Sequence, residues 1–371
     1  MHKNKLLQSK GKIMIRCKKI AVILAVFSAM GMVVQGQGNG DSIALSQNVR
    51  TPLPALAPAA YRGHFWRVDA ENNGGLPRNF RTCQSPFHKV EHKYASEVDS
   101  SYVPSRKGLD DLRISGSGQF SARQFDALVQ ALRKKTKGPI YDVDLRQESH
   151  GFFNGTAVSW YGRHDWGNIG KSPTAVLADE QQRLQAALGT DVLVYDQGKG
   201  DLPVHPRAMA VRRVQTEREL AESKGIHYVR LANTDHLWPT PGEIDAFLAF
   251  VRTLPDDAWL HFHCEAGAGR TTAYMVMYDM IKNPGLPYKD IVYRQYEIGG
   301  NYTPHDVIHL KQGDWKGPYY HEKHEMVSLF YQYVQDQVRQ GGSQSWSQWL
   351  KNKRMRVNNS LNKTAMKDNE L

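Results

Sequence analysis

Residues 263–271 read His263-Cys264-Glu265-Ala266-Gly267-Ala268-Gly269-Arg270-Thr271. A cysteine ends a predicted strand here, five residues with two glycines follow, and an arginine and a threonine open a predicted helix. Glycines allow consecutive backbone N–H groups to point to one side, and a helix amino terminus adds roughly half a positive charge at the same place. The stretch therefore predicts an anion-binding loop in which the backbone N–H groups of Glu265, Ala266, Gly267, Ala268, Gly269 and Arg270 and the side chain of Arg270 bind the anion.

The side chains of this loop point to phosphoryl transfer. Arg270 can hold two phosphate oxygens with its planar guanidinium. The helix terminus and this cation favour the thiolate form of Cys264, the predicted nucleophile, and Thr271 can donate a hydrogen bond to it. The alternative is a buried core cysteine followed by a plain turn. That alternative would leave Arg270 and the loop amides as unpaired buried donors, so we prefer the nucleophile.

A leaving alkoxide needs a proton, so a carboxylic acid should lie on a loop near the phosphate. Asp235 is the best candidate, because it stands 29 residues before Cys264 in an irregular segment that ends in Trp238-Pro239. The alternative is that Asp235 only caps the following helix. Thr240 is the better cap, since Glu243 follows it in a capping box.

Strands and helices alternate along the chain, which predicts an α/β fold. The predicted strands are residues 140–146, 226–231 and 259–263, and the predicted helices are residues 117–137, 216–224, 240–251, 271–281 and 326–338. In such a sheet the reactive loops gather at the carboxyl ends of the strands. Cys264 follows a predicted strand directly, and Asp235 lies four residues after the end of another.

Composition divides the chain into six parts. We predict a signal peptide (1–37), an extended arm rich in Gly and Pro (38–77), the first part of the core (78–151), a small inserted domain (152–214), the second part of the core with the catalytic loop (215–342), and a basic, solvated tail (343–371). Mixed strand and helix patterns with many glycines distinguish residues 152–214 from the core.

The amino-terminal segment indicates export. Seven basic residues precede or flank a 15-residue apolar run, residues 20–34, and glycines follow it. This run is shorter than the ~20 residues of a membrane-spanning helix, so we predict a cleaved signal peptide, a periplasmic or secreted location and no stable membrane anchor. Loss of the leader lowers the formal net charge from +11 to +4. No basic stripe with interleaved aromatics follows, which argues against a nucleic-acid partner.

Two cysteines, Cys83 and Cys264, lie after the leader. Cys83 is either an inert buried thiol, the interpretation we favour, or a partner that forms a disulfide with Cys264 under oxidation. The sequence gives no oligomeric state.

In its predicted loop and in the segment around Asp235, the chain resembles the bacterial protein-tyrosine-phosphatase-like inositol phosphatases, the cysteine phytases. The resemblance rests on the loop 263–272, on Thr234-Asp235-His236-Leu237-Trp238-Pro239-Thr240-Pro241, and on the blocks 142–151 and 158–162, and it runs from about residue 78 to 333. It implies a protein tyrosine phosphatase-like core, a central sheet flanked by helices, interrupted by a small β-barrel-like domain. It also implies metal-independent, cofactor-free hydrolysis of phytate and lower inositol polyphosphates (3-phytase or PTP-like class) through a cysteinyl-phosphate.

The resemblance further implies substrate contacts outside the loop, at Arg81, His236, Lys316, Tyr320 and Lys323, with Lys199 as a weaker guess. Solvated surface charges are the alternative for the lysines. Two other functions stay open at this stage: a secreted protein tyrosine or phosphoinositide phosphatase, and a catalytically silent phosphate-binding effector.

Overall fold

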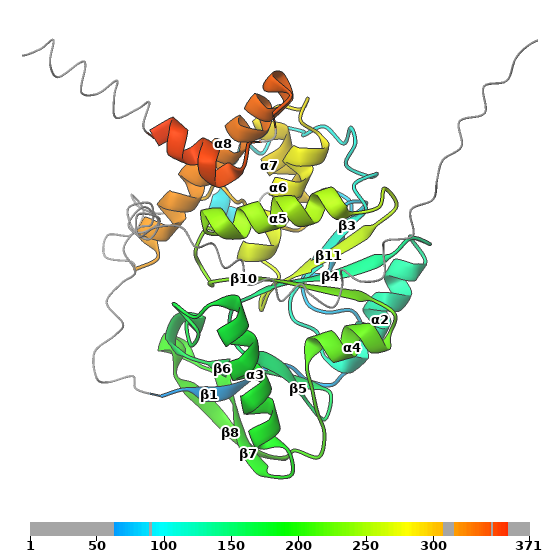
Figure 1. The fold of residues 1–371 in the computed structure, drawn as a ribbon, viewed down its shortest axis with the longest axis vertical. Coiled ribbons are helices and arrows are strands. Elements are labelled where there is room, and N and C mark those ends of the chain that lie inside the picture. Colours follow the sequence, from blue (N-terminus) through cyan, green and yellow to red (C-terminus); the bar gives the residue numbers. More distant parts are fainter. Residues whose placement is uncertain (1–62, 89–90, 307–314, 343, 355–371) are drawn as a thin grey trace, which may run out of the picture. The chain divides into compact units, whose positions relative to one another are not determined.

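The computed structural model describes residues 63–88, 91–306, 315–342 and 344–354 (Figure 1). The predicted signal peptide, most of the predicted arm and the end of the tail lie outside the described residues. Among the described residues, no helix combines the length and the apolar character needed to cross a membrane.

A five-stranded sheet forms the centre of the core. Its strand order is β10-β4-β11-β3-β2, with β2 antiparallel and the other strands parallel to their neighbours. The strands are β2 (Arg81–Thr82), β3 (Ile114–Ser117), β4 (Ile140–Arg146), β10 (His227–Asn233) and β11 (Trp259–His263). Because β4, β10 and β11 are parallel neighbours, the segments that follow them emerge at one edge of the sheet. This arrangement brings Cys264 and the segment containing Asp235 together.

Helices cover both faces of this sheet, with α5 to α8 on one face and α2 and α4 on the other (Figure 1). Their bounds are α2 (Ala122–Arg133), α4 (Glu217–Ser223), α5 (Pro241–Thr253), α6 (Gly269–Lys282), α7 (Tyr288–Glu297) and α8 (Gly317–Gln340). Capping boxes begin α2, α4 and α5, at Ser121, Thr216 and Thr240. Helix α6 is buried almost all round, as its apolar sequence predicts.

A second, six-stranded sheet has the order β8-β7-β1-β6-β5-β9. Its strands are β1 (Phe65–Ala70), β5 (His150–Phe153), β6 (Thr156–Tyr161), β7 (Asp191–Gln197), β8 (Pro203–Ala210) and β9 (Val214–Gln215). Helix α3 (Pro173–Ala187) packs against β5 and β9. The structure also has three short 3-10 turns, η1 (His92–Tyr94), η2 (Arg163–Asp165) and η3 (Lys199–Asp201). Among the described pairings β8 and β9 end the sheet, so it is not a closed barrel.

Two predicted boundaries of this sheet were wrong. Strand β1, residues Phe65–Ala70, lies within the predicted arm but pairs with both β6 and β7 in the middle of the second sheet. Strand β5 begins at His150, two residues before the predicted insertion. The inserted residues therefore complete their sheet with a strand from well upstream. The predicted arm was inferred from surrounding glycines and prolines, which conceal a six-residue strand.

The tail was also predicted wrongly in its described part. Residues 346–354 are helical, and the side chains of Trp346 and Trp349 are 0% and 6% exposed. Trp346 contacts Phe330 and Tyr333 of α8, with ring centroids 5.5 Å apart in each pair. The net basic charge of the tail conceals these apolar anchors, so this part of the tail belongs to the core.

Cys83 and Cys264 lie at opposite ends of β3. The Cys83 amide donates to the carbonyl of Ile114, and Ile114 pairs with Leu260, four residues before Cys264. Four residues of strand span about 13 Å, whereas a disulfide joins Cα atoms no more than about 7 Å apart. Both thiols are free and buried, and burial raises the pKa of Cys83. The structure therefore does not support the disulfide and favours an inert Cys83.

We predict that Trp346→Ala destabilises the protein by about 3–5 kcal/mol, because it empties a fully buried site in the core. Urea unfolding measures the change. Val338→Ala on α8, where the side chain is 60% exposed, is the control and should shift the midpoint very little. Equal midpoints for the two variants would indicate that residues 344–354 are a solvated tail and are not packed into the core.

Candidate active site

The anion-binding loop connects the end of β11 to the start of α6. Within the described part of the chain, the backbone amides of residues 265–271 have no hydrogen-bond acceptor. Seven consecutive donors therefore stand at the amino end of a buried helix, where the helix dipole favours an anion. This agrees with the predicted binding role of residues 265–270.

Gly267 allows the loop to pass close to β3. Its φ of +73° lies in the left-handed region, and a Cβ built on it would be 2.2 Å from the amide nitrogen of Gly118. A side chain at this position would clash with backbone and strain the turn. The glycine spacing in the sequence thus reflects both the turn and the close approach.

Cys264 lies at the base of the loop and is 2% exposed. The hydroxyl of Thr271 donates to its Sγ at 3.1 Å, the contact predicted from the sequence. This hydrogen bond fixes the orientation of the sulfur at the base of the loop.

Arg270 is held by two carboxylates. Its Nη1 and Nη2 donate to the two oxygens of Glu148 at 2.8 and 3.0 Å, and its Nε lies 3.1 Å from Oδ1 of Asp235. Nη1 also donates to the Asn233 carbonyl at 3.1 Å. The guanidinium therefore connects the loop to the predicted general acid.

Glu148 lies in the block 142–151, and the sequence predicted no role for it. Both of its oxygens are buried, and Arg146 donates to one of them at 2.7 Å. Burial acts to raise the pKa of Glu148, but Arg270 and Arg146 outweigh burial and hold it well below its usual range. Its position directly after β4, at the edge where the reactive loops gather, was the available signal.

Residues 234–241 form the acid segment, which places Asp235 beside the guanidinium of Arg270. Burial acts to raise the pKa of Asp235, but Arg270 and His236 outweigh it and lower the pKa. His236 has a left-handed φ of +65°, and its Nε2 lies 3.3 Å from Oδ2 of Asp235. Burial lowers the pKa of His236 to about 4. At neutral pH this imidazole is a neutral hydrogen-bonding group rather than a cation.

The three lysines among the predicted outer contacts differ in how they lie relative to the loop. Lys323, on α8, has its ammonium beside the loop, 3.8 Å from where a Cβ of Gly269 would lie, and 4.8 Å from the centroid of the Tyr320 ring. Lys316 caps the same helix with its Nζ 5.3 Å from the centroid of Trp315. Lys199 is exposed at η3, and no described contact links it to the loop.

Arg81 supports the loop from beneath. It is 2% exposed, and it donates to the Gly267 carbonyl at 2.7 Å and to the Thr272 hydroxyl at 3.0 Å. The prediction of an outer substrate contact therefore needs revision, because these bonds turn the guanidinium towards the loop backbone.

Comparisons with known proteins agree with this geometry. The family described as "PTPlike_phytase: Inositol hexakisphosphate" matches residues 143–282. A PTP-like phytase from Bdellovibrio bacteriovorus is 30% identical, with a TM-score of 0.60, over 81% of this chain and 99% of that one. This chain is a member of the PTP-like phytase family.

Other relatives are longer than this phytase-family chain. The tandemly repeated protein tyrosine phosphatase like phytase from Mitsuokella multacida is 47% identical, with a TM-score of 0.75, over 83% of this chain and 51% of that one. The PTP-like myo-inositol phosphatase from Mitsuokella multacida, solved in complex with myo-inositol-(1,3,4,5)-tetrakisphosphate, is also 47% identical with a TM-score of 0.75. The effector protein hopD2 of Pseudomonas syringae pv. tomato is 30% identical over 71% of this chain and 57% of its own length.

Arg78 and Asn79 brace the rim of the phytase loop and were not predicted. Arg78 donates to the backbone carbonyl of Glu265 at 2.6 Å and pairs with its carboxylate, and Asn79 donates to the Ala266 carbonyl at 2.8 Å. Each of these contacts joins residues that are 187 positions apart in the chain, so no local sequence pattern could predict it.

A buried polar cluster lies beneath the loop. Asp142, Glu217 and His263 form one group with ligand atoms within 4.8 Å of one another, and Asp144, His150 and Glu217 form another. By distance each group could hold a metal ion. The side chains also pair with one another, because His263 Nε2 lies 2.7 Å from Glu217, and Asp144 helps to raise the pKa of His150 to about 10 against the opposing effect of burial.

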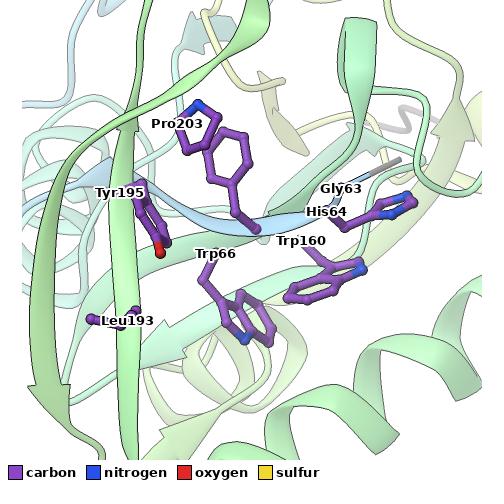
Figure 2. A pocket seen from close by; sticks show the side chains of 8 residues that line it. Gly63, His64, Trp66, Trp160, Leu193, Tyr195 and Pro203 are labelled. Atoms are coloured by element: carbon purple, nitrogen blue, oxygen red, sulfur yellow. The ribbon is translucent and has the colours of Figure 1, made fainter. Parts of the chain in front are cut away.

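The second sheet carries a separate hollow of about 440 Å³. Its lining residues are Gly63, His64, Phe65, Trp66, Trp160, Leu193, Tyr195 and Pro203, and Figure 2 shows their rings around strands of this sheet. None of them belongs to the loop, the acid segment or the predicted outer contacts, so the hollow is separate from the candidate active site.

We predict that Glu148→Gln destabilises the protein by about 3–5 kcal/mol, because it removes the buried charge that Arg270 and Arg146 share and leaves each guanidinium with one carboxylate partner. Denaturant unfolding tests this. Asp110→Asn, which breaks the exposed pair with Arg106, is the matched control and should cost less than about 1 kcal/mol. If the two variants unfold alike, Glu148 does not anchor Arg270.

We predict that sulfate binds more weakly as the pH rises through about 8. Burial lowers the pKa of Lys323 to about 8, so its ammonium loses its charge above that pH while sulfate keeps its own. Titration calorimetry at pH 7 and 9.5 measures the loss, which should be several-fold. Lys323→Arg should abolish this loss, since arginine stays charged. An equal loss in this variant would exclude Lys323 as its source.

Proposed function

We propose that this chain is a phosphate monoester hydrolase that acts on inositol hexakisphosphate and lower inositol polyphosphates through a cysteinyl-phosphate. The single observation that carries the proposal is the juxtaposition at the loop. Seven amides with no acceptor among the described residues lie beside the Arg270 guanidinium and the Cys264 thiol, and the carboxyl group of Asp235 is 3.1 Å from Nε of that guanidinium.

In the first step the Cys264 thiolate attacks phosphorus. The sulfur–phosphorus bond forms while the ester oxygen leaves, and Asp235 gives that oxygen its proton. The loop amides and Arg270 hold the equatorial oxygens, where charge is spread in the transition state.

In the second step a water molecule attacks the cysteinyl-phosphate. Asp235, now a carboxylate, takes the proton of that water, the sulfur–phosphorus bond breaks, and inorganic phosphate leaves. Thr271, which donates to Sγ, stabilises the departing thiolate. The residues in these steps are the chain's own and require no metal or cofactor.

The cations around the loop support a polyphosphorylated substrate. Lys323, Lys316 and Arg78 stand on α8 and the rim of the loop, outside the grip of Arg270 on one phosphate. Several dispersed cations suit a ring with several phosphates better than a narrow aromatic slot for phosphotyrosine. The related Mitsuokella protein in complex with an inositol tetrakisphosphate agrees with this substrate class.

We also propose export of the enzyme to the periplasm or the medium. The basic and apolar leader of residues 1–37 supports it, as does the similarity to an effector protein.

The test is phosphate release from inositol hexakisphosphate in the presence of EDTA. We expect release by wild type, loss of at least about a thousandfold in Cys264→Ser, and a loss of about 10²–10⁴-fold in Asp235→Asn. Asp110→Asn serves as the unaffected control.

A phosphotyrosine peptide is the second substrate. Turnover of the peptide without turnover of the inositol phosphate would keep the mechanism and change the substrate. Binding of the inositol phosphate with no release above the Cys264→Ser background would instead indicate a silent binding module.

A further inference from the structure

The segment between β6 and α3 contacts the catalytic apparatus from the side of the second sheet. We call residues 163–168 the strap. His164 and Asp165 have φ values of +61° and +63°, a left-handed conformation that residues other than glycine rarely adopt. Such backbone persists only where surrounding contacts hold it, and it concentrates at functional sites.

The base of the strap is packed tightly. A Cβ on Gly162 would be 2.9 Å from Nε2 of His64, and a Cβ on Gly167 would be 3.2 Å from the Trp160 carbonyl. Figure 2 shows His64 beside Trp160, and the two rings are parallel within 4°. The strap therefore starts from a fixed position on the second sheet.

The strap holds the general acid through its backbone. The indole Nε1 of Trp166 donates to the carbonyl oxygen of Asp235 at 3.0 Å. Trp166 is 4% exposed and packs with Leu237 and Tyr319. A buried indole donates a single hydrogen bond, and here that bond goes to the residue predicted to carry the proton.

The strap also braces the other carboxylate on Arg270. Asn168 Nδ2 donates to the Gln147 carbonyl at 3.1 Å and to the Ser149 hydroxyl at 2.8 Å, on either side of Glu148. Both carboxylates that pair with Arg270 are therefore flanked by strap contacts.

A third contact reaches Trp315, two residues before α8. The imidazole of His164 stacks on Trp315 with ring centroids 3.7 Å apart, and Trp315 meets the edge of the His236 ring at 5.2 Å. One short segment thus contacts the acid segment, the Glu148 segment and the start of α8.

We infer that Trp166 is a positioning residue that sets the general acid, its indole N–H fixing the backbone of Asp235 so that the carboxyl group reaches the leaving oxygen. This inference rests on the proposed function. By this inference the second sheet contributes to catalysis, because the strap that extends from it holds the backbone of Asp235 through one hydrogen bond.

The test compares two substrates that differ in their need for an acid. Departure of an inositol oxygen requires a proton, whereas 4-nitrophenolate leaves without one. We expect Trp166→Phe to lower kcat/KM for inositol hexakisphosphate by about five- to tenfold, the size of one lost hydrogen bond. The value for p-nitrophenyl phosphate should change by less than about twofold. The parameter kcat/KM is used because it excludes hydrolysis of the cysteinyl-phosphate.

A double variant shows whether Trp166 acts through Asp235. In an Asp235→Asn background Trp166→Phe should cause no further loss, because the group that it positions no longer donates a proton. Trp349→Phe is the matched control. Its indole is similarly buried and donates to Asp336 at 3.0 Å, and its removal should leave both substrates unaffected.

Equal losses on both substrates, or a loss that persists with Asp235→Asn, would overturn the inference. If Trp166→Phe unfolds, Leu237→Ala replaces it. This variant removes the apolar contact between Trp166 and the segment that carries Asp235, and it should give the same substrate-selective loss. A wild type inactive on both substrates would refute the proposed function itself, a different result from an active wild type that tolerates Trp166→Phe.

Discussion

The buried guanidinium of Arg270 is the constraint on which the site depends. A guanidinium taken out of water is unfavourable unless its donors are paired, and here Glu148, Asp235 and the Asn233 carbonyl all contact it. These partners come from the ends of two parallel strands, β4 and β10. The pairing therefore fixes the loop after β11 relative to its neighbours, and a single charge requirement aligns three segments distant in sequence.

The same requirement extends into the second sheet. Glu148 also pairs with Arg146, and Arg146 pairs with Asp69 of β1 at 2.9 Å. Asp69 in turn accepts from Arg67, which reaches Asp165 of the strap. The charges alternate in sign along this path and are nearly all buried. Because the inner members pair on both sides, removal of one takes a charge partner from each of its two neighbours, and the second sheet is therefore more than a passive appendage to the core.

The sequence predicted those parts of the site that are specified by residues close together in the chain. The loop 263–271, the acid segment and the capped helices are short patterns in which neighbouring residues determine one another, and the structure places them as expected. Glu148, Arg78 and Trp166 gain their roles from partners far along the chain, so spacing could not reveal them. Strand β1 and the helix at 346–354 were missed for a related reason, since each is short and becomes stable only through packing against distant elements.

A count of donors shows how substrate and acid compete for Arg270. Glu148 occupies one N–H on each of Nη1 and Nη2, and the Asn233 carbonyl takes the other on Nη1. The guanidinium has five N–H groups, so Nε and one N–H of Nη2 are left for a phosphate. Asp235 lies against that same Nε, and Arg270 helps to hold its pKa low. A phosphate that takes this edge displaces the carboxylate and brings a second negative charge near it. Both changes act to raise the pKa of Asp235, so in the proposed mechanism substrate binding itself favours the protonated form that can give its proton to the leaving oxygen.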